Sequence, residues 1–162
     1  MNQNLIDEKF MSIAIKSALQ ANKNGEVPVG AVIVKNNKII AKGYNQMVSL
    51  NDPTAHAEIN VIRSAAKKLG NYRMPGCTIY VTLEPCIMCI GAIFHSRLKR
   101  VVFGTKDEDK EILCNTLDLF KNKKINHHSE IMGGILSEKC KEILSNFFRS
   151  KRLIKEKHFD LN

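Results

Sequence analysis

Short apolar runs alternate with segments of helical periodicity along this chain, and this alternation restricts the possible fold more than any other feature of the sequence. Apolar side chains recur at helical spacing over residues 6–21. Strand-like runs are predicted at residues 29–34, 38–43, 78–83, 100–103 and, more weakly, 130–132. Because strands that alternate with helices pack as one sheet covered on both faces, we predict an α/β domain of three layers, α/β/α.

Turn and cap signals divide the chain between these runs. Residues 35–38, Lys-Asn-Asn-Lys, are typical of a tight turn that joins the first two strands into a hairpin, which makes the sheet mixed. A helix is predicted up to residue 69, with Asp52 or Thr54 as its N-cap and Gly70 at its end. Further helices are predicted at residues 85–95, 113–120 and from Ser137 onward.

The composition is that of a single cytoplasmic domain. The chain has no repeat, low-complexity stretch or linker-like segment, so residues 1–162 are predicted to form one domain. Its first residues include acids where a signal peptide would be basic, and no apolar segment approaches the roughly 20 residues of a membrane span. We expect a cytoplasmic protein with reduced thiols, because five cysteines, an odd number, fit a disulfide framework poorly.

Two short motifs carry side chains that bind metals. The first contains His56 and Glu58 in the order His-x-Glu, and the second contains Cys86 and Cys89 in the order Pro-Cys-x-x-Cys. Zinc favours nitrogen and sulfur ligands, and a catalytic zinc site offers three of them while a fourth position stays open for water. Two cysteines three residues apart share one face of a helix, and the helix N-terminus favours their thiolates. His56 is the expected third ligand, provided that the two helices begin side by side.

Glu58 is the candidate proton shuttle. It follows His56 by two positions and so points to another side of the helix. Metal binding lowers the pKa of a water to about 7, and a nearby carboxylate can take that proton and pass it to a ring nitrogen and a departing amine. His-x-Glu followed by Pro-Cys-x-x-Cys is a known signature of zinc nucleobase deaminases.

Each motif alone has a plainer interpretation. An isolated Cys-x-x-Cys is often redox-active or structural, and an isolated His-x-Glu is common by chance. The other cysteines, Cys77, Cys114 and Cys140, form no second Cys-x-x-Cys, so a closed four-cysteine site is not expected. They are predicted to be ordinary buried thiols.

The sequence resembles the bacterial tRNA-specific adenosine deaminase family over nearly its whole length. The His-Ala-Glu and Pro-Cys-x-x-Cys motifs are shared with the wider cytidine deaminase superfamily, whereas Thr-Ala-His-Ala-Glu-Ile and the final Phe-Phe-Arg are closer to the tRNA branch. The segments that carry the resemblance are Glu26-Val-Pro-Val-Gly-Ala-Val32, Asn51-Asp-Pro-Thr-Ala-His-Ala-Glu-Ile59, Asn71-Tyr-Arg73, Tyr80-Val-Thr-Leu-Glu-Pro-Cys86, His95-Ser-Arg97, Val101-Val-Phe-Gly104 and Phe147-Phe-Arg149.

This resemblance implies a cytidine deaminase-like fold with a central five-stranded sheet, and a homodimer. It implies one Zn²⁺ per chain, held by His56, Cys86 and Cys89, with Glu58 as the proton shuttle. The implied reaction is hydrolytic deamination of adenosine to inosine at the wobble position of a tRNA anticodon. The sequence departs from the family at residues 108–115, where family members carry a run of small residues and this chain carries Glu-Asp-Lys-Glu-Ile-Leu-Cys-Asn.

The resemblance also implies substrate contacts. The family's asparagine at the position of Asn45 binds the target nucleoside, and a segment matching Phe147, Phe148 and Arg149 contacts the anticodon loop. Aromatic rings and guanidinium groups suit unstacked RNA bases. The alternatives are helix packing for Phe147 and exposure of Arg149 to solvent.

Two other functions remain in competition. A small-molecule deaminase of the same superfamily would act on guanine, cytosine or a nucleoside, but it would have little use for the net charge of +9, which attracts phosphate backbones. A non-catalytic RNA-binding protein with a structural zinc would have no use for Glu58 and would favour a fourth protein ligand.

Overall fold

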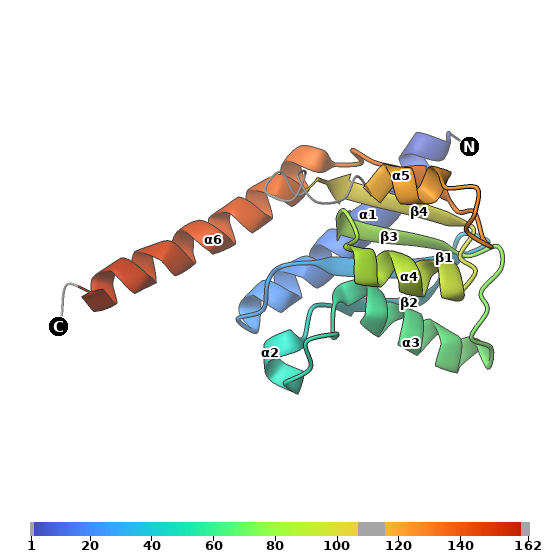
Figure 1. Ribbon diagram of the computed structural model, residues 1–162. Coiled ribbons are helices and arrows are strands. Elements are labelled where there is room, and N and C mark those ends of the chain that lie inside the picture. Colours follow the sequence, from blue (N-terminus) through green and yellow to red (C-terminus); the bar gives the residue numbers. More distant parts are fainter. Residues whose placement is uncertain (1, 107–115, 160–162) are drawn as a thin grey trace.

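The computed structural model describes residues 2–106 and 116–159. Figure 1 shows a central sheet with helices on both of its faces and one long helix that extends away from it. The order of elements follows the sequence prediction, with one addition, the short helix α2. In chain order the elements are α1 (Gln3–Lys23), β1 (Gly30–Lys35), β2 (Lys38–Tyr44), α2 (Met47–Leu50), α3 (Ala57–Leu69), β3 (Thr78–Leu83), α4 (Ile87–His95), β4 (Arg100–Thr105), α5 (Thr116–Lys121), β5 (Glu130–Met132) and α6 (Ser137–Phe159).

The strands form one mixed sheet, as predicted. Its order is β2-β1-β3-β4-β5. Strand β1 is antiparallel to both β2 and β3, whereas β3, β4 and β5 are parallel to one another. Parallel neighbours need a crossover, and α4 provides the one between β3 and β4. Helix α4 therefore begins at the end of the sheet where β3 finishes, and this places the Pro-Cys-x-x-Cys segment there.

Two sharp reversals of the chain use residues that tolerate a left-handed backbone. Asn36 and Asn37 join β1 to β2 with φ values of 50° and 57°. A turn with two positive φ angles matches the twist of the flanking strands, which confirms the predicted hairpin. Gly70 ends α3 with a φ of 63°, also as predicted.

Helices cover both faces of the sheet, which confirms the three-layer prediction. Alternate residues of β1 face opposite sides, so Ile33 contributes to one core and Val32 to the other. On one face α3, α4 and α5 pack through Ala57, Val61, Ala65, Ile90, Ile93 and Phe120. On the other face α1 and α6 pack through Phe10, Met11, Ala14 and Cys140.

Helix α3 begins later than its sequence signals predict. The expectation of an N-cap at Asp52 or Thr54 is wrong, because α3 starts at Ala57 with His56 as its N-cap. Asp52 Oδ1 instead accepts the backbone N–H and the hydroxyl of Thr54 at 2.8 and 2.7 Å. This local turn competes with helix formation. The side chain that caps α3 comes from elsewhere: Asn45 Oδ1 accepts the Ala57 N–H at 2.8 Å.

The C-terminal part of the chain is less compact. Figure 1 shows α6 projecting beyond the end of the sheet at which α3 and α4 begin. Helix α5 matches the end of the helix predicted over 113–120, while the divergent segment 108–115 lies outside the described residues. Among the helices that the structure describes, none is long and apolar enough to cross a membrane.

Candidate metal centre

His56, Cys86 and Cys89 meet where helices α3 and α4 begin. His56 is the N-cap of α3, Cys86 is the N-cap of α4, and Cys89 lies in the first turn of α4. The Nδ1 atom of His56 is 3.7 Å from the Sγ atom of Cys86 and 3.6 Å from that of Cys89. The three atoms all lie within 4.8 Å of one another. The structure thus brings together three side chains from two separate segments.

The spacing of these atoms suits a tetrahedral zinc ion. With Zn–S bonds of about 2.3 Å and Zn–N bonds of about 2.0 Å, tetrahedral angles put a ligand nitrogen roughly 3.5 Å from a ligand sulfur. The two observed nitrogen–sulfur distances agree with this value. One imidazole and two sulfurs are also the donor types that zinc prefers, and three protein ligands leave one coordination position for water.

The two thiols are electrostatically unequal. The hydrogen bond from Cys89, followed by the contact with His56, lowers the pKa of Cys86 to about 3. The pKa of Cys89 is raised, because its thiol is the partner of Cys86 and because it is buried. The lowered pKa favours the thiolate form of Cys86, and a bound cation would favour the thiolate form of both cysteines.

Glu58 lies beside these ligands and is buried, with 4% of its surface exposed. It is the second residue of α3. Burial raises the pKa of Glu58 to about 7, and the negative charge of Cys86 acts in the same direction. A carboxyl group with a pKa near 7 can both accept and release a proton at neutral pH, which is what a proton shuttle requires.

Asn45 is buried next to the start of α3. Its Oδ1 accepts the Ala57 N–H, and this bond fixes the orientation of the side-chain amide. No hydrogen bond to the described residues uses its Nδ2 group. Asn45 therefore combines a structural acceptor with a donor that is available to another molecule.

Phe147, Phe148 and Arg149 lie on α6, outside the His56/Cys86/Cys89 cluster. Phe147 is buried, with its ring centroid 5.4 Å from that of Phe148 and 5.4 Å from Lys151 Nζ. Its low exposure agrees with helix packing, and a contact of Phe147 with RNA stays a prediction. Phe148 is 46% exposed, and Arg149 is exposed while its guanidinium donates to Asn146 Oδ1. These two side chains lie on the surface of α6.

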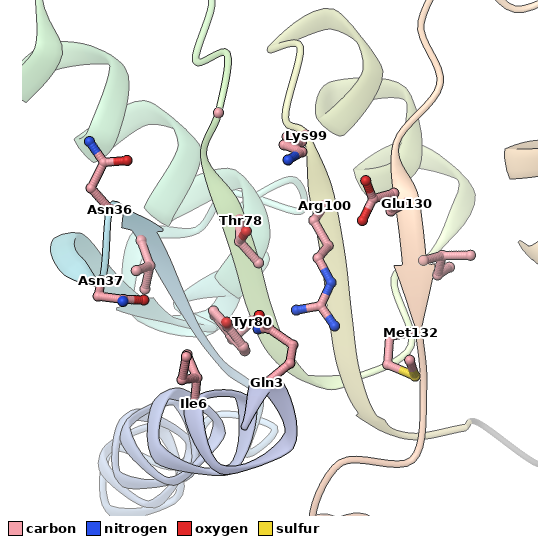
Figure 2. A pocket seen from close by; sticks show the side chains of 13 residues that line it. Gln3, Ile6, Asn36, Asn37, Thr78, Tyr80, Lys99, Arg100, Glu130 and Met132 are labelled. Carbon is pink, nitrogen blue, oxygen red and sulfur yellow. The ribbon is translucent and has the colours of Figure 1, made fainter. Parts of the chain in front are cut away.

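A separate hollow of about 440 Å³ lies at the opposite end of the sheet, where β3 and β4 begin. Figure 2 shows Arg100 pointing into it near Tyr80. Its lining residues are Gln3, Ile6, Val34, Asn36, Asn37, Gly76, Thr78, Tyr80, Lys99, Arg100, Glu130, Ile131 and Met132. None of them belongs to the metal centre.

Comparison with known proteins identifies the family. Residues 5–105 match the cytidine and deoxycytidylate deaminase zinc-binding region, and this span contains His56, Cys86 and Cys89. The tRNA-specific adenosine deaminase of Buchnera aphidicola subsp. Baizongia pistaciae is 49% identical over 157 residues, which are 96% of this chain and 96% of the relative. The chain belongs to the tRNA-specific adenosine deaminase family. Zinc as the cofactor is thereby confirmed.

Two solved structures are similar to this chain. One, from work on A-to-I editing by tRNA:A34 deaminases at the wobble position of transfer RNA, superimposes with a TM-score of 0.78 at 40% identity and covers 84% of this chain and 99% of that chain. The guanine deaminase of Bacillus subtilis gives a TM-score of 0.60 at 44% identity and covers 65% of this chain and 66% of that chain. The predicted cytidine deaminase-like fold is confirmed.

One buried residue, Glu26, received no role from the sequence. Glu26 is 1% exposed, and its carboxylate accepts backbone N–H groups of α2. Glu26 lies in the loop that precedes β1, where the apolar residues show neither helical nor strand periodicity. The sequence therefore did not indicate that this carboxylate is buried. Helix α2 was also missed, because four residues are too short to show a helical repeat.

Proposed function

We propose that this chain hydrolyses adenosine to inosine at the wobble position of a tRNA anticodon. Water replaces the exocyclic amine at C6 of adenine, so that the products are inosine and ammonia. The observation that carries the proposal is the cluster of His56, Cys86 and Cys89 beside the buried Glu58. The tRNA-specific adenosine deaminase of Buchnera aphidicola, similar over 96% of this chain, supports the choice of substrate.

We assign a different role in the reaction to each side chain of the site. His56, Cys86 and Cys89 would hold the zinc ion, which would supply an activated water as the nucleophile. Glu58 would take one proton of the attacking water and deliver it to N1 of adenine, and would then carry the proton of the resulting C6 hydroxyl to the amine, so that C6 keeps a carbonyl oxygen and ammonia leaves. Asn45 donates from Nδ2 to the target nucleoside while its Oδ1 stays bonded to α3. These assignments rest on the geometry of the side chains and on the family resemblance.

An anticodon loop suits a buried site of this kind. Adenine C6 inside a stacked duplex is out of reach, and extruding a base costs a few kcal/mol. Bases in a loop have already lost part of their stacking. The exposed Phe148 and Arg149 on α6 are proposed to contact the same loop, because an aromatic ring and a guanidinium group both stack on bases.

The direct test is deamination of a defined RNA. Purified zinc-loaded protein is incubated with an anticodon stem-loop that carries adenosine at the wobble position, and inosine is measured after nuclease digestion. Inosine is expected, and a stem-loop with guanosine at that position is the matched control. The proposal is overturned if the stem-loop stays unmodified while free guanine, cytosine or a nucleoside is deaminated.

Guanine deamination is the second candidate, favoured by the 44% identity to the Bacillus subtilis guanine deaminase. Salt dependence separates the two functions. An RNA substrate releases counterions on binding, so kcat/KM falls steeply as salt rises, whereas turnover of a neutral base is nearly independent of salt. The net charge of +9 favours RNA.

Further proposals concern the context of the enzyme. We propose a homodimer, which is supported by the family resemblance and by the exposed apolar side chains of Ile87 and Met88 at the start of α4. Sedimentation velocity tests the homodimer, and a monomer at micromolar concentration would contradict it.

We also propose a cytoplasmic location, because that is where a tRNA substrate is found. One sheet that joins residues 30–132 supports a single domain.

A further inference from the structure

Helix α2 is too short and too exposed to be stable by itself. It contains only four residues, Met47–Leu50, and none of them is buried. Val48 and Leu50 are 70% and 55% exposed. One turn of helix is unstable alone, because the entropy of fixing its backbone exceeds the gain from so few hydrogen bonds. The conformation of α2 must therefore be maintained by contacts from another part of the chain.

Glu26 provides that contact. Its Oε2 accepts the Val48 N–H at 3.1 Å, and its Oε1 accepts the Ser49 N–H at 2.7 Å. These N–H groups are in the first turn, where a helix offers them no acceptor. The N-cap residue, Gln46, forms no side-chain cap hydrogen bond. Glu26 thus caps α2 from a position more than 20 residues earlier in the chain.

Glu26 is itself held rigidly and carries a charge. Its own N–H donates to the carbonyl of Ala21 at 3.0 Å, which ties it to the end of α1. Burial alone would raise the pKa of Glu26, but the N–H groups of Ser49 and Val48 outweigh that effect and lower it. Hydrogen bonds from N–H groups to an ionised carboxylate are stronger than those to a neutral acceptor. The Glu26 carboxylate is therefore well suited to hold the first turn of α2.

The segment that contains α2 begins and ends at the metal centre. Asn45 precedes it and His56 follows it. The Gln46 N–H donates to the carbonyl of Ala55 at 2.9 Å, and Asn60 Nδ2 donates to the carbonyls of Tyr44 and Ala55 at 2.9 and 3.2 Å. The loop is therefore closed at its base. Figure 1 shows α2 at the same end of the molecule as the start of α3.

We propose that Glu26 is a positioning residue for substrate binding: by capping α2 it fixes a rim beside the metal centre, on which Val48 and Leu50 present apolar surface to the nucleotides that flank the target. This inference rests on the proposed function. Glu26 touches neither the metal ligands nor the target base in this account. It acts through α2, so its loss changes substrate affinity more than the rate of the chemical step.

The experiment compares two buried carboxylates. Glu26→Gln keeps the shape of the side chain but removes its charge and turns one oxygen into a donor that faces an N–H group. Asp7→Asn is the matched control, because Asp7 is 2% exposed and lies at the opposite end of the sheet, where Arg100 lines the hollow. Both variants are checked for zinc content and thermal unfolding before kinetics are measured.

We expect Glu26→Gln to change KM while kcat stays nearly the same. Glu26→Gln raises KM for the anticodon stem-loop about tenfold and changes kcat by less than about twofold, which corresponds to lost binding and not to lost chemistry. Asp7→Asn lowers stability but leaves both constants within about twofold of wild type. Equal KM values for wild type and Glu26→Gln overturn the proposal, and so does an equal rise in KM for both variants.

Amide hydrogen exchange gives a second measurement that needs no substrate. The Val48 and Ser49 amides are expected to be protected in the wild type, and at least one of them is expected to exchange at least about tenfold faster in Glu26→Gln, because glutamine keeps one acceptor oxygen and turns an NH2 group toward the other amide. Unchanged protection overturns the proposed anchor. If the wild type forms no inosine, the proposed function has failed, and the exchange data still decide whether Glu26 holds α2.

Discussion

Arg100 holds the buried carboxylate of Asp7 through two hydrogen bonds, of 2.7 and 2.8 Å, although the two residues are far apart in the chain. The same carboxylate accepts the hydroxyl of Tyr80 at 2.9 Å and the side-chain amide of Gln3 at 3.0 Å. These bonds join α1 to β3 and β4. The fold is therefore fastened at the end of the sheet that lies away from the metal centre.

Asp7→Asn is predicted to destabilise the protein without impairing catalysis. The substitution removes the carboxylate from a pair whose side chains are 3% and 14% exposed, and so leaves the Arg100 guanidinium without the anion to which it is hydrogen-bonded. Breaking a buried pair in this way costs about 3 kcal/mol. Urea denaturation at neutral pH measures the loss. A variant as stable as the wild type would show that the pair contributes nothing net.

The stability that Asp7 contributes is predicted to disappear in acid. Burial alone would raise the pKa of Asp7, but hydrogen bonds from Arg100, Gln3 and Tyr80 outweigh burial and lower it. A lowered pKa in the folded state means that the contribution is complete above the unfolded value of about 3.9 and is lost as the pH falls through the folded value. The difference in unfolding free energy between wild type and Asp7→Asn should therefore stay constant from neutral pH to about pH 5 and shrink below about pH 4. A difference that grows in acid would contradict this sign.

A feature of this structure could be predicted from the sequence only where the residues that form it are close together in the chain. The spacing of Cys86 and Cys89 and the turn at Asn36 are local, so a periodic or turn signal shows them. The cap that Asn45 gives to α3 and the Asp7–Arg100 pair join distant positions. No local pattern records such pairs. This is why the start of α3 was predicted too early, at a local cap that serves a turn instead.

Glu58→Gln is predicted to stop turnover while the fold and the zinc content stay intact. The carboxylate is buried, so the neutral amide removes a desolvation penalty and the variant should be at least as stable as the wild type. The loss of a general acid–base group lowers kcat by roughly 10²–10⁴-fold. Single-turnover inosine formation and zinc analysis measure the two effects separately. Near-normal kcat would remove Glu58 from the mechanism.

Removal of zinc is predicted to abolish activity and to lower the melting temperature together. The three ligand atoms connect the starts of α3 and α4, so a bound cation stabilises the folded state by mass action, by about 2.7 kcal/mol at a hundredfold excess over Kd. Chelation followed by thermal unfolding tests this, and added Zn²⁺ should restore both properties. Full activity after chelation, with zinc verified as absent, would contradict the assignment.

Two substitutions of Asn45 are predicted to separate its two roles. Asn45→Asp keeps an oxygen that accepts the Ala57 N–H but loses the Nδ2 donor, so stability holds and kcat/KM falls. Asn45→Ala also loses the cap, which costs about 1 kcal/mol of stability. Thermal unfolding and steady-state kinetics on the stem-loop give the comparison. If Asn45→Asp retains wild-type kcat/KM, Nδ2 makes no contact with substrate.

The hairpin turn at Asn36 and Asn37 lies at the opposite end of β1 from the loop that carries Glu26. Strand β1 contains six residues, which is on the order of 20 Å of extended chain. A fluorophore attached at the exposed position Lys38 would therefore stay clear of an arriving RNA while remaining within energy-transfer range of a dye on its anticodon loop. Because the strand fixes the distance between the dye and the α2 end of the molecule, the energy-transfer efficiency would report binding and release of the RNA.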